Sequence, residues 1–459
     1  MSLQEKIYSR LPVFLQNIAC SMKGREIASR RYSREFFDLF EKIRDRDRLP
    51  ADEMSELRFR RLRDNLITAY ETSEYYRDLF DRHAFDPYRM EDPDELLRLP
   101  LHRKADIKNN LHSMVNRTVE KGSTIKATTS GTTGSGLVFP MSHACERETW
   151  AVWWRYRHNH GISFDTWCAI FGARSIVPLD QQTPPFYRTI SPMRQVLFSM
   201  HHLNRRNIAS YVEAFNKMQI PWIHGHPSTI ANMASLMHEN DLRLNYPVKY
   251  ITIGSENLLE HQIEIIENVF GITPIQHYGL TEPVANISMC EHGKLHIDED
   301  YSFVELVPTE EDDNRYHLIG TSFSNDALFF LRYDTNDIVT LEEDQSCPCG
   351  RSGRIIKSIE GRKDDYIVMR DGTRIGRLST IFRRLTHVKE AQIRQEADGH
   401  VIFFVVKSAK YTDEDETVLK EEIESRLDVD YSIKYVDTIP KTKGGKLKFV
   451  ISNYEGNRK

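Results

Sequence analysis

A loop rich in glycine and hydroxyl residues carries the clearest chemical signal in this chain. Segment 128–136 reads Thr-Thr-Ser-Gly-Thr-Thr-Gly-Ser-Gly, with three glycines and six hydroxyl side chains. Glycines let consecutive backbone N–H groups approach an anion, and short hydroxyls add donors that do not obstruct it. The pattern predicts a phosphate-binding loop, with a Ser/Thr/Gly surface linker as the alternative. It is not a Walker A motif, because Ser135 follows Gly134 where that motif needs a lysine.

Three cysteines and a histidine have the spacing of metal ligands. Cys290 precedes His296 by six residues, and Cys347-Pro348-Cys349 forms a second pair later in the chain. Three thiols and one imidazole are sufficient for a closed, tetrahedral zinc site of the structural kind. His292 is a competing imidazole in the same segment, and ordinary thiols are the alternative to a metal site.

Polar residues follow three short apolar runs that predict parallel strands. The runs are 221–225, 249–253 and 273–278, and turn residues come directly after each. Ligands of open α/β sheets bind beyond the carboxyl ends of the strands, so His226, Glu256 and Glu282 are candidate site residues. We expect Ser228 to cap the helix that follows the first run.

The bulk properties exclude several classes of protein. A chain of 459 residues is long enough for two or more domains. Its net charge of -5 and its pI near 6.4 lack the basic signal of a nucleic-acid-binding protein. No signal peptide, long apolar span or disulfide scaffold is evident, so we expect a cytoplasmic protein without a membrane partner. The alternating charges of segment 44–48 predict a solvated helix face.

The elements that position these residues are legible from periodicity. Residues from about 1 to 115 predict a mainly helical segment, and parallel βα units begin near Thr166. The last hundred residues predict a strand at 401–406, a helix capped by Thr412 and a strand at 432–439. The polar segment 361–365 predicts a domain boundary or hinge.

Five segments occur in the order seen in the adenylate-forming ligases. They are the loop at 128–136, the acids Glu256 and Glu282, the segments 331–337 and 361–365, and the Lys-Gly-Gly-Lys tail within 440–448. Over residues 60 to 450 the chain resembles the phenylacetate–coenzyme A ligase-like branch of that superfamily. Segments 361–368 and 371–375 look more like the proteins found with capsule-polysaccharide genes.

The resemblance implies an α/β fold with a large N-terminal domain and a small, mobile α+β domain. The large domain, 1–360, contains mixed and parallel sheets, and the small domain, 361–459, carries the catalytic lysine. The implied reaction joins a small-molecule carboxylic acid to AMP from ATP with Mg²⁺, then transfers the acyl group to coenzyme A. An amide-forming ligase acting on an amino sugar or amino acid, and a non-catalytic nucleotide-binding protein, are the alternatives. Whether the chain forms a homodimer is a further open alternative.

The resemblance also assigns roles to individual residues. Lys446 is the catalytic lysine, and Glu282 is the catalytic acid that meets Mg²⁺. Asp337, rather than Asp334, binds the ribose hydroxyls. The nucleotide-binding set comprises Ser130, Gly131, Thr132, Thr133, Gly134, Glu256, Tyr278, Gly279, Thr281, Asp337 and Arg362. Asp364 is the hinge residue. The zinc ligands are Cys290, His296, Cys347 and Cys349, with His296 preferred to His292. Trp150 to Tyr156, Phe171 and His226 are candidates for an acyl pocket.

Overall fold

The chain divides into two compact units, each assembled from segments far apart in the sequence. The computed structural model describes residues 3–120, 122–129, 136–172, 176–309, 314–362, 366–370, 374–375, 378–382, 385, 387–442 and 446–454. The first unit contains Met1–Glu26, Phe164–Gln276 and Gly361–Lys459, and the second contains Ile27–Ser163 and His277–Glu360. Both units combine sheets with helices, which confirms the predicted α/β class. The predicted boundary at 361 remains a proposal.

A mostly parallel sheet of five strands lies in the first unit. Its order is β7-β6-β3-β5-β4, in which only β4 runs antiparallel to its neighbour. The strands are β3 (Cys168–Phe171), β4 (Tyr187–Ile190), β5 (Gln195–Phe198), β6 (Trp222–Gly225) and β7 (Tyr250–Gly254), with η3 (Ser191–Met193) after β4. Since parallel strands need crossovers, helices connect them along the chain.

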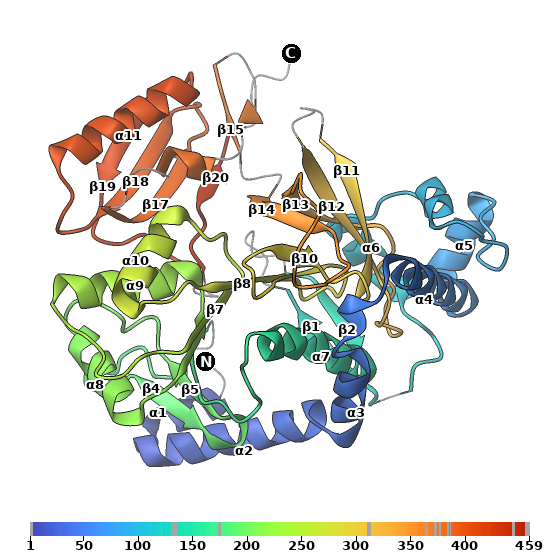
Figure 1. Ribbon diagram of the computed structural model, residues 1–459, viewed down its shortest axis with the longest axis horizontal. Helices are drawn as coiled ribbons and strands as arrows, with labels where there is room; N and C mark the ends of the chain where they lie inside the picture. The colour runs from blue at the N-terminus through green and yellow to red at the C-terminus, as the bar shows by residue number, and fades with distance from the viewer. Residues whose placement is uncertain are drawn as a thin grey trace. The chain divides into compact units, whose positions relative to one another are not determined.

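Three helices pack with this sheet into one apolar core (Figure 1). They are α8 (Ile208–Met218), α9 (Pro227–Glu239) and α10 (Glu260–Phe270). Ile230 and Met233 of α9 are fully buried, as their helical spacing predicts. Gly271 ends α10 with a φ of 74°, a left-handed conformation that favours glycine. The N-terminal helix α1 (Leu3–Arg10) and α2 (Val13–Arg31) contact the same unit, since Tyr8 Oη donates to Ile176 O.

The C-terminal part of the first unit builds its own sheet and core. Strands β17 (Val388–Gln395), β18 (Val401–Lys407), β19 (Tyr431–Tyr435) and β20 (Val450–Ser452) have the order β19-β18-β17-β20. Helix α11 (Asp413–Arg426) begins at Thr412, which forms a capping box with Asp415. The hairpin β15 (Ile367–Val368) and β16 (Arg374–Ile375) and the turn η4 (Leu378–Phe382) complete this part. Its apolar cluster draws only on residues after 366.

The second unit contains seven strands in the order β11-β12-β13-β14-β10-β9-β8. They are β8 (Ile275–Gly279), β9 (Asn286–Met289), β10 (Leu295–Ile297), β11 (Ser302–Pro308), β12 (Arg315–Ser322), β13 (Tyr333–Leu341) and β14 (Ile355–Arg362). The pairs β8/β9, β9/β10, β10/β14, β11/β12 and β12/β13 are antiparallel. A separate hairpin joins β1 (Thr124–Thr128) to β2 (Val138–Ser142).

Helices of the second unit surround these strands and form most of the segment before residue 115 (Figure 1). They are α3 (Arg34–Ile43), η1 (Arg46–Arg48), α4 (Ala51–Thr72), α5 (Glu74–Arg82), η2 (Pro93–Arg98), α6 (Lys104–Met114) and α7 (His143–Asn159). Leu62 and Leu66 of α4 are fully buried in a core that includes Phe329 and Phe330. The apolar periodicity of this segment therefore marks the buried faces of its helices.

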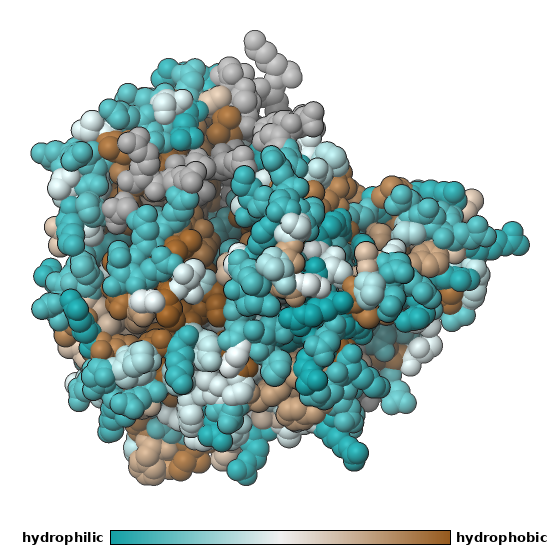
Figure 2. Space-filling model, in the orientation of Figure 1, coloured by the Kyte–Doolittle hydropathy of each residue, from teal (hydrophilic) through white to brown (hydrophobic). Residues whose placement is uncertain are grey.

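The visible surface is mostly hydrophilic, with scattered hydrophobic patches (Figure 2). Phe14, Ile18 and Met22 of α2 are exposed large hydrophobic side chains, and they are spaced four residues apart. One face of α2 is therefore apolar and exposed. Among the helices that the structure describes, none has both the length and the apolar composition needed to cross a membrane.

Candidate nucleotide site and metal cluster

Two of the predicted nucleotide-binding residues contact each other in the second unit. Tyr278, on β8, donates a hydrogen bond of 2.7 Å from its hydroxyl to Oδ2 of Asp337, on β13. Burial and the adjacent Asp337 raise the pKa of Tyr278 well above its usual value, so the phenol stays protonated and can donate. A carboxylate has several lone pairs on its two oxygens, so Asp337 can accept hydrogen bonds from ligand hydroxyls in addition to the one from Tyr278.

Local backbone geometry on β13 distinguishes Asp337 from Asp334. Asp334 accepts a hydrogen bond from the backbone N–H of Asn336, and Asn336 has a φ of 64°. This left-handed residue separates the two acids, and the backbone N–H of Asp337 then donates to Thr335 Oγ1. Asp334 is therefore engaged with its own turn, whereas Asp337 is the acid that reaches Tyr278.

Glu282 is buried and held by a tyrosine of the same unit. Its side chain is 6% exposed, and Oε1 accepts a hydrogen bond of 3.1 Å from the hydroxyl of Tyr333. Tyr333 is the first residue of β13, so this strand contacts both Glu282 and Tyr278. Thr281, the residue before Glu282, is exposed. A buried carboxylate with one neutral donor retains the oxygens that a hard cation binds.

Gly279 lies where a side chain would be tightly crowded by its neighbours. A Cβ atom at this position would lie 3.1 Å from Asn286 Oδ1, 3.1 Å from His277 Cε1 and 3.4 Å from Trp153 Cζ2. Asn286 fixes the other two groups, because its Oδ1 accepts from Trp153 Nε1 and is bonded to His277 Nε2. Trp153 therefore lies beside the nucleotide motif, as one of the predicted acyl-pocket aromatics. Phe171 is instead buried in the first unit's core, stacked on Phe198.

The glycine-rich loop connects the two strands of the β1–β2 hairpin. The last paired residues are Thr128 and Val138, and Thr129 and Leu137 exchange two further hydrogen bonds of 2.9 Å beyond them. The hairpin therefore holds the ends of the loop together. Ser130, Gly131, Thr132, Thr133 and Gly134 lie outside the described residues, as does Asp364, and Arg362 is described only as the last backbone position of β14.

Glu256 and the segment of Lys446 meet in the first unit. Glu256 Oε1 accepts a hydrogen bond of 2.9 Å from the backbone N–H of Leu447, next to Lys446. Its other oxygen, Oε2, accepts one of 3.3 Å from the N–H of Ser228. The predicted cap by Ser228 is therefore wrong, since α9 begins at Pro227 after His226 and the Ser228 N–H is satisfied by Glu256. Both oxygens of Glu256 thus bind main chain.

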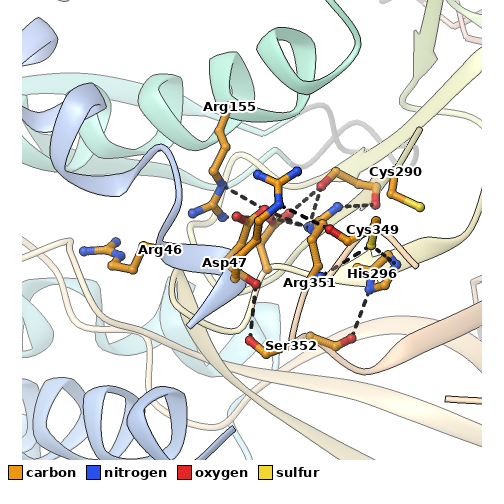
Figure 3. A network of polar contacts seen from close by, with 12 residues as sticks. Arg46, Asp47, Arg155, Cys290, His296, Cys349, Arg351 and Ser352 are labelled. Carbon is orange, nitrogen blue, oxygen red and sulfur yellow. Dashed lines mark hydrogen bonds and ion pairs between the residues drawn. The ribbon is translucent and has the colours of Figure 1, made fainter. Parts of the chain in front are cut away.

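The four predicted zinc ligands converge in the second unit, and Figure 3 shows three of them, Cys290, His296 and Cys349. The ligand atoms of Cys290, His296, Cys347 and Cys349 all lie within 4.8 Å of one another. Cys290 and Cys347 Sγ are 3.7 Å apart, and Cys349 Sγ is 3.5 Å from His296 Nε2. A tetrahedral zinc ion, with Zn–S near 2.3 Å and Zn–N near 2.0 Å, requires about 3.8 Å and about 3.6 Å for these edges. The donor set therefore fits a closed zinc site.

The surroundings of His296 orient it for this arrangement. Its Nδ1 lies 3.1 Å from the carbonyl oxygen of Gly353, which leaves Nε2 facing Cys349. Strand β10 holds His296 between Ser288 and Ile355, and the residue is fully buried. His292, the competing imidazole, is exposed. The structure thus brings His296, and not His292, into the cluster.

A buried network of charges adjoins the cysteine cluster (Figure 3). Arg351, two residues after Cys349, makes ion pairs of 2.9 Å with both Asp47 and Asp298. Arg155 of α7 is 1% exposed and pairs with Asp298 and Asp300 at 2.8 Å. Although burial opposes ionisation, the neighbouring guanidinium groups hold the pKa of Asp300 well below its usual value. Asp300 therefore remains charged because it is paired with Arg46 and Arg155.

This network corrects the expectation of a solvated face at 44–48. Asp47 is 3% exposed, and Arg46 donates from Nε to Asp300 Oδ2 at 2.7 Å. The short turn η1 carries Arg46 and Asp47 into the network, whereas Asp45, just before the turn, stays exposed as expected. An alternating charge pattern fits a solvated helix and a buried ion-pair network equally well. Only the tertiary partners distinguish the two, and the partner of Arg46, Asp300, lies 254 residues away in the chain.

The same network extends to the nucleotide motif. Asp298 Oδ2 accepts from Asn286 Nδ2 at 2.6 Å, and Asn286 is the residue that fixes Trp153 and His277 beside Gly279. A continuous set of hydrogen bonds therefore runs from Arg351 through Asp298 to β8. Sequence reasoning missed Asp47, Arg155, Asp298 and Arg351, because no local pattern distinguishes a buried charge from an exposed one.

Comparison with known sequences identifies relatives over nearly the whole chain. The family model of the CapK C-terminal domain matches residues 367–453. Protein CapK of Staphylococcus aureus is 25% identical over 97% of this chain and 99% of its own length. The phenylacetate–coenzyme A ligase of Thermus thermophilus is 23% identical over 70% of this chain and 73% of its own.

Comparison with solved structures shows the same fold elsewhere. A 2-hydroxyisobutyryl-CoA ligase in the postadenylation state, in complex with R3-HIB-AMP, matches with a TM-score of 0.69 and 17% identity. The match covers 89% of this chain and 91% of that one. An open conformation of the ligase, in complex with 2-HIB-AMP and CoA, matches with a TM-score of 0.57 and 18% identity, covering 88% and 92%. At this level of identity, the likeness establishes the fold.

Proposed function

Because the chain belongs to the adenylate-forming superfamily, we propose that it activates a carboxylic acid with ATP through an acyl-adenylate and then forms a thioester with coenzyme A. The observation that carries the proposal is the contact between Tyr278 and Asp337, with Glu282 on Tyr333 beside it. Two acids and two phenols, from β8, the segment after it and β13, thus pair within the second unit. The reaction class is proposed from the similarity to these relatives. Coenzyme A as the acyl acceptor is the more specific part of the proposal.

The proposed roles of the residues are those that the resemblance implies, and the chemistry of each side chain suits its role. Asp337 accepts hydrogen bonds from the ribose hydroxyls while Tyr278 fixes its orientation. The hydroxyls and amides of Ser130, Thr132 and Thr133 bind the polyphosphate, with Gly131 and Gly134 allowing close approach. Arg362, Gly279 and Thr281 complete the nucleotide contacts. Lys446 stabilises the charge that develops as the carboxylate attacks the α-phosphate, which releases pyrophosphate.

A magnesium ion would be held by Glu282 together with phosphate oxygens. When bound, it would neutralise charge on the polyphosphate. The buried position of Glu282 and the hydrogen bond it accepts from Tyr333 are compatible with this role. Tyr333 orients the carboxylate of Glu282 through this hydrogen bond.

Zinc is proposed for Cys290, His296, Cys347 and Cys349. The support is the fit of their interatomic distances to tetrahedral edges. Four protein ligands leave no open position, so the role would be structural. The ion would join the segment around 290 to the 347–353 segment, from which Arg351 enters the buried charge network.

A product analysis tests the proposed reaction. The purified protein is incubated with ATP, Mg²⁺ and a panel of carboxylic acids, first alone and then with coenzyme A or with amino sugars and amino acids. We expect AMP and an acyl-adenylate without acceptor, and an acyl-coenzyme A when the thiol is present, detected by mass spectrometry. An amide product without a thioester would overturn the acceptor. ATP binding without any acid-dependent AMP would overturn the reaction.

A further inference from the structure

Glu256 directly follows an unusual backbone position in the first unit. Ser255, the residue before it, has a φ of 69°, a left-handed conformation that a residue with a Cβ adopts at a cost of about 1 kcal/mol. The turn follows directly on β7. This strained turn sets the direction of the chain at Glu256, whose half-buried carboxylate reaches two main-chain groups. A strained backbone conformation of this kind persists only where the surrounding contacts hold the residue in place.

The first contact of Glu256 is with helix α9. The N-cap position of this helix, His226, makes no side-chain capping hydrogen bond. Glu256 Oε2 accepts from the N–H of Ser228 in the first turn, where a negative charge is also favoured by the helix dipole. If this were its only contact, Glu256 would simply be an external cap of α9.

The second contact is with the segment that carries Lys446. Glu256 Oε1 accepts from the N–H of Leu447 at 2.9 Å, a short bond that joins residues 191 positions apart. The backbone of Lys446 makes two hydrogen bonds with Thr442: its N–H donates to the side-chain Oγ1, and its carbonyl accepts from the Thr442 N–H. One carboxylate therefore connects the start of α9 to the residue beside the proposed catalytic lysine.

The other side of this segment is anchored to the C-terminal sheet. Gln392 Nε2 donates to the carbonyl of Lys448 at 2.7 Å, and the N–H of Ile393 donates to Phe449 O at 2.8 Å. Lys441 also pairs with Glu390 at 2.8 Å. The sheet thus fixes residues 448–452, and Glu256 fixes Leu447 from α9. These two sets of bonds limit the positions available to Lys446.

A second ion pair joins the C-terminal part to the other end of α9. Lys389 Nζ lies 2.6 Å from Glu239 Oε1, and the two side chains are 14% and 8% exposed. The backbone N–H of Ala409 also donates to Glu239. Because Glu239 is the last residue of α9 and Glu256 binds the first turn of this helix, a carboxylate lies at each end of α9 and binds C-terminal residues. Glu256 is the one that contacts the lysine segment.

We infer that Glu256 is a positioning residue that docks the Lys446 segment for the adenylation step, rather than a contact of the nucleotide. The inference rests on the proposed function for its effect on rate, but the docking itself is independent of activity. Glu256 fixes Leu447 through a charge-assisted hydrogen bond. Because Lys446 is the residue before Leu447, this bond also restricts the position of the Lys446 backbone.

Hydrogen exchange and single-turnover kinetics of the full chain test this role. The variants are Glu256→Ala, Glu256→Gln and, as a matched control, Glu264→Ala at an exposed position of α10. In Glu256→Ala we expect about tenfold faster amide exchange in the peptide containing 446–452 and an about tenfold slower adenylation. ATP affinity should stay within about twofold, and Glu256→Gln should fall between Glu256→Ala and the parent protein. The control should match the parent.

Three results would overturn the inference. Faster exchange at 227–232 alone would make Glu256 only a cap of α9. Weaker ATP affinity with unchanged exchange at 446–452 would make it a nucleotide contact. Unchanged exchange in both peptides would leave it no docking role. If the parent protein shows no adenylation with any acid, the proposed function fails, while the exchange measurements still decide the docking.

Discussion

The hydroxyl of Tyr278 and Oδ2 of Asp337 lie 2.7 Å apart, although 59 residues separate them in the chain. Strand β13, which carries Asp337, also begins with Tyr333, the donor to Glu282. One strand thereby sets the positions of the two acids that the proposed reaction uses for ribose and for the metal ion. This arrangement predicts distinct effects for substitutions at each residue.

Replacing Asp337 should weaken nucleotide binding. Asp337→Asn removes one of the two acceptor oxygens and its charge, and a hydrogen bond to a charged group contributes about 1.5–3 kcal/mol, or roughly 10–100-fold in affinity. The measurement is the KM for ATP in adenylation. Asp334→Asn is the matched control, since Asp334 binds its own turn. Equal effects of the two variants would contradict the assignment.

Replacing Lys446 should spare binding and remove catalysis. Lys446→Ala deletes the ammonium that stabilises the forming acyl phosphate, so we expect adenylation to fall by about 100-fold or more while ATP affinity is retained. Direct nucleotide binding and single-turnover adenylation separate the two effects. Lys448→Ala is the control. Near-normal pyrophosphate release by Lys446→Ala would disprove the assignment of this lysine.

The cysteine cluster predicts about one zinc per chain in purified protein. Cys349→Ser should reduce the metal content and lower the melting temperature, because it removes one of four ligands that hold two segments together. Cys20→Ala, outside the cluster, should keep its zinc. Elemental analysis and thermal unfolding are the measurements. Less than about half an equivalent in the parent protein would count against the site.

Arg155 should contribute strongly to stability. Arg155→Ala leaves Asp298 and Asp300 buried with fewer partners, and breaking such a pair costs about 3–5 kcal/mol in the free energy of unfolding. Arg370→Ala breaks an exposed pair with Asp428 and should cost less than about 1 kcal/mol. Chemical denaturation distinguishes them. A similar small cost for both would mean that the buried network is not a stabilising unit.

Buried His261 predicts a dependence of stability on pH. Burial lowers its pKa to about 4 from an ordinary 6.5, so between these values the unfolded chain binds the proton and the folded chain does not. The free energy of unfolding should therefore fall as pH drops from about 6.5 to 4, by up to about 1.4 kcal/mol per pH unit. His261→Met should remove one proton from the difference in proton binding between the unfolded and folded states, and so reduce that slope. An unchanged slope would contradict the prediction.

The sequence was sufficient for features that local spacing encodes. Ile230 and Met233 marked the buried face of α9, Thr412 marked the start of α11, and the Cys-Pro-Cys pair with His296 marked a cluster that the structure brings together. The fold class and the superfamily followed from motifs in a fixed order. These signals depend on neighbouring residues or on the order of segments, both of which a sequence contains.

Features that depend on distant partners were not predictable. Asp47 is buried only because Arg155 and Arg351 reach it from other elements, and the carboxylate of Glu256 satisfies the N–H of Ser228 that local rules assign to a side-chain cap. The contact of Glu256 with Leu447 likewise joins segments 191 residues apart. Tertiary pairing decides each of these, and no local pattern records it.

Acid-dependent exchange of labelled pyrophosphate into ATP tests the central claim most directly, because it reports formation of an acyl-adenylate without requiring knowledge of the acceptor. With a broad panel of carboxylic acids, we expect exchange with at least one acid, dependent on Mg²⁺ and abolished in Lys446→Ala. Absence of exchange with every acid, by folded protein that still binds ATP, would contradict the account.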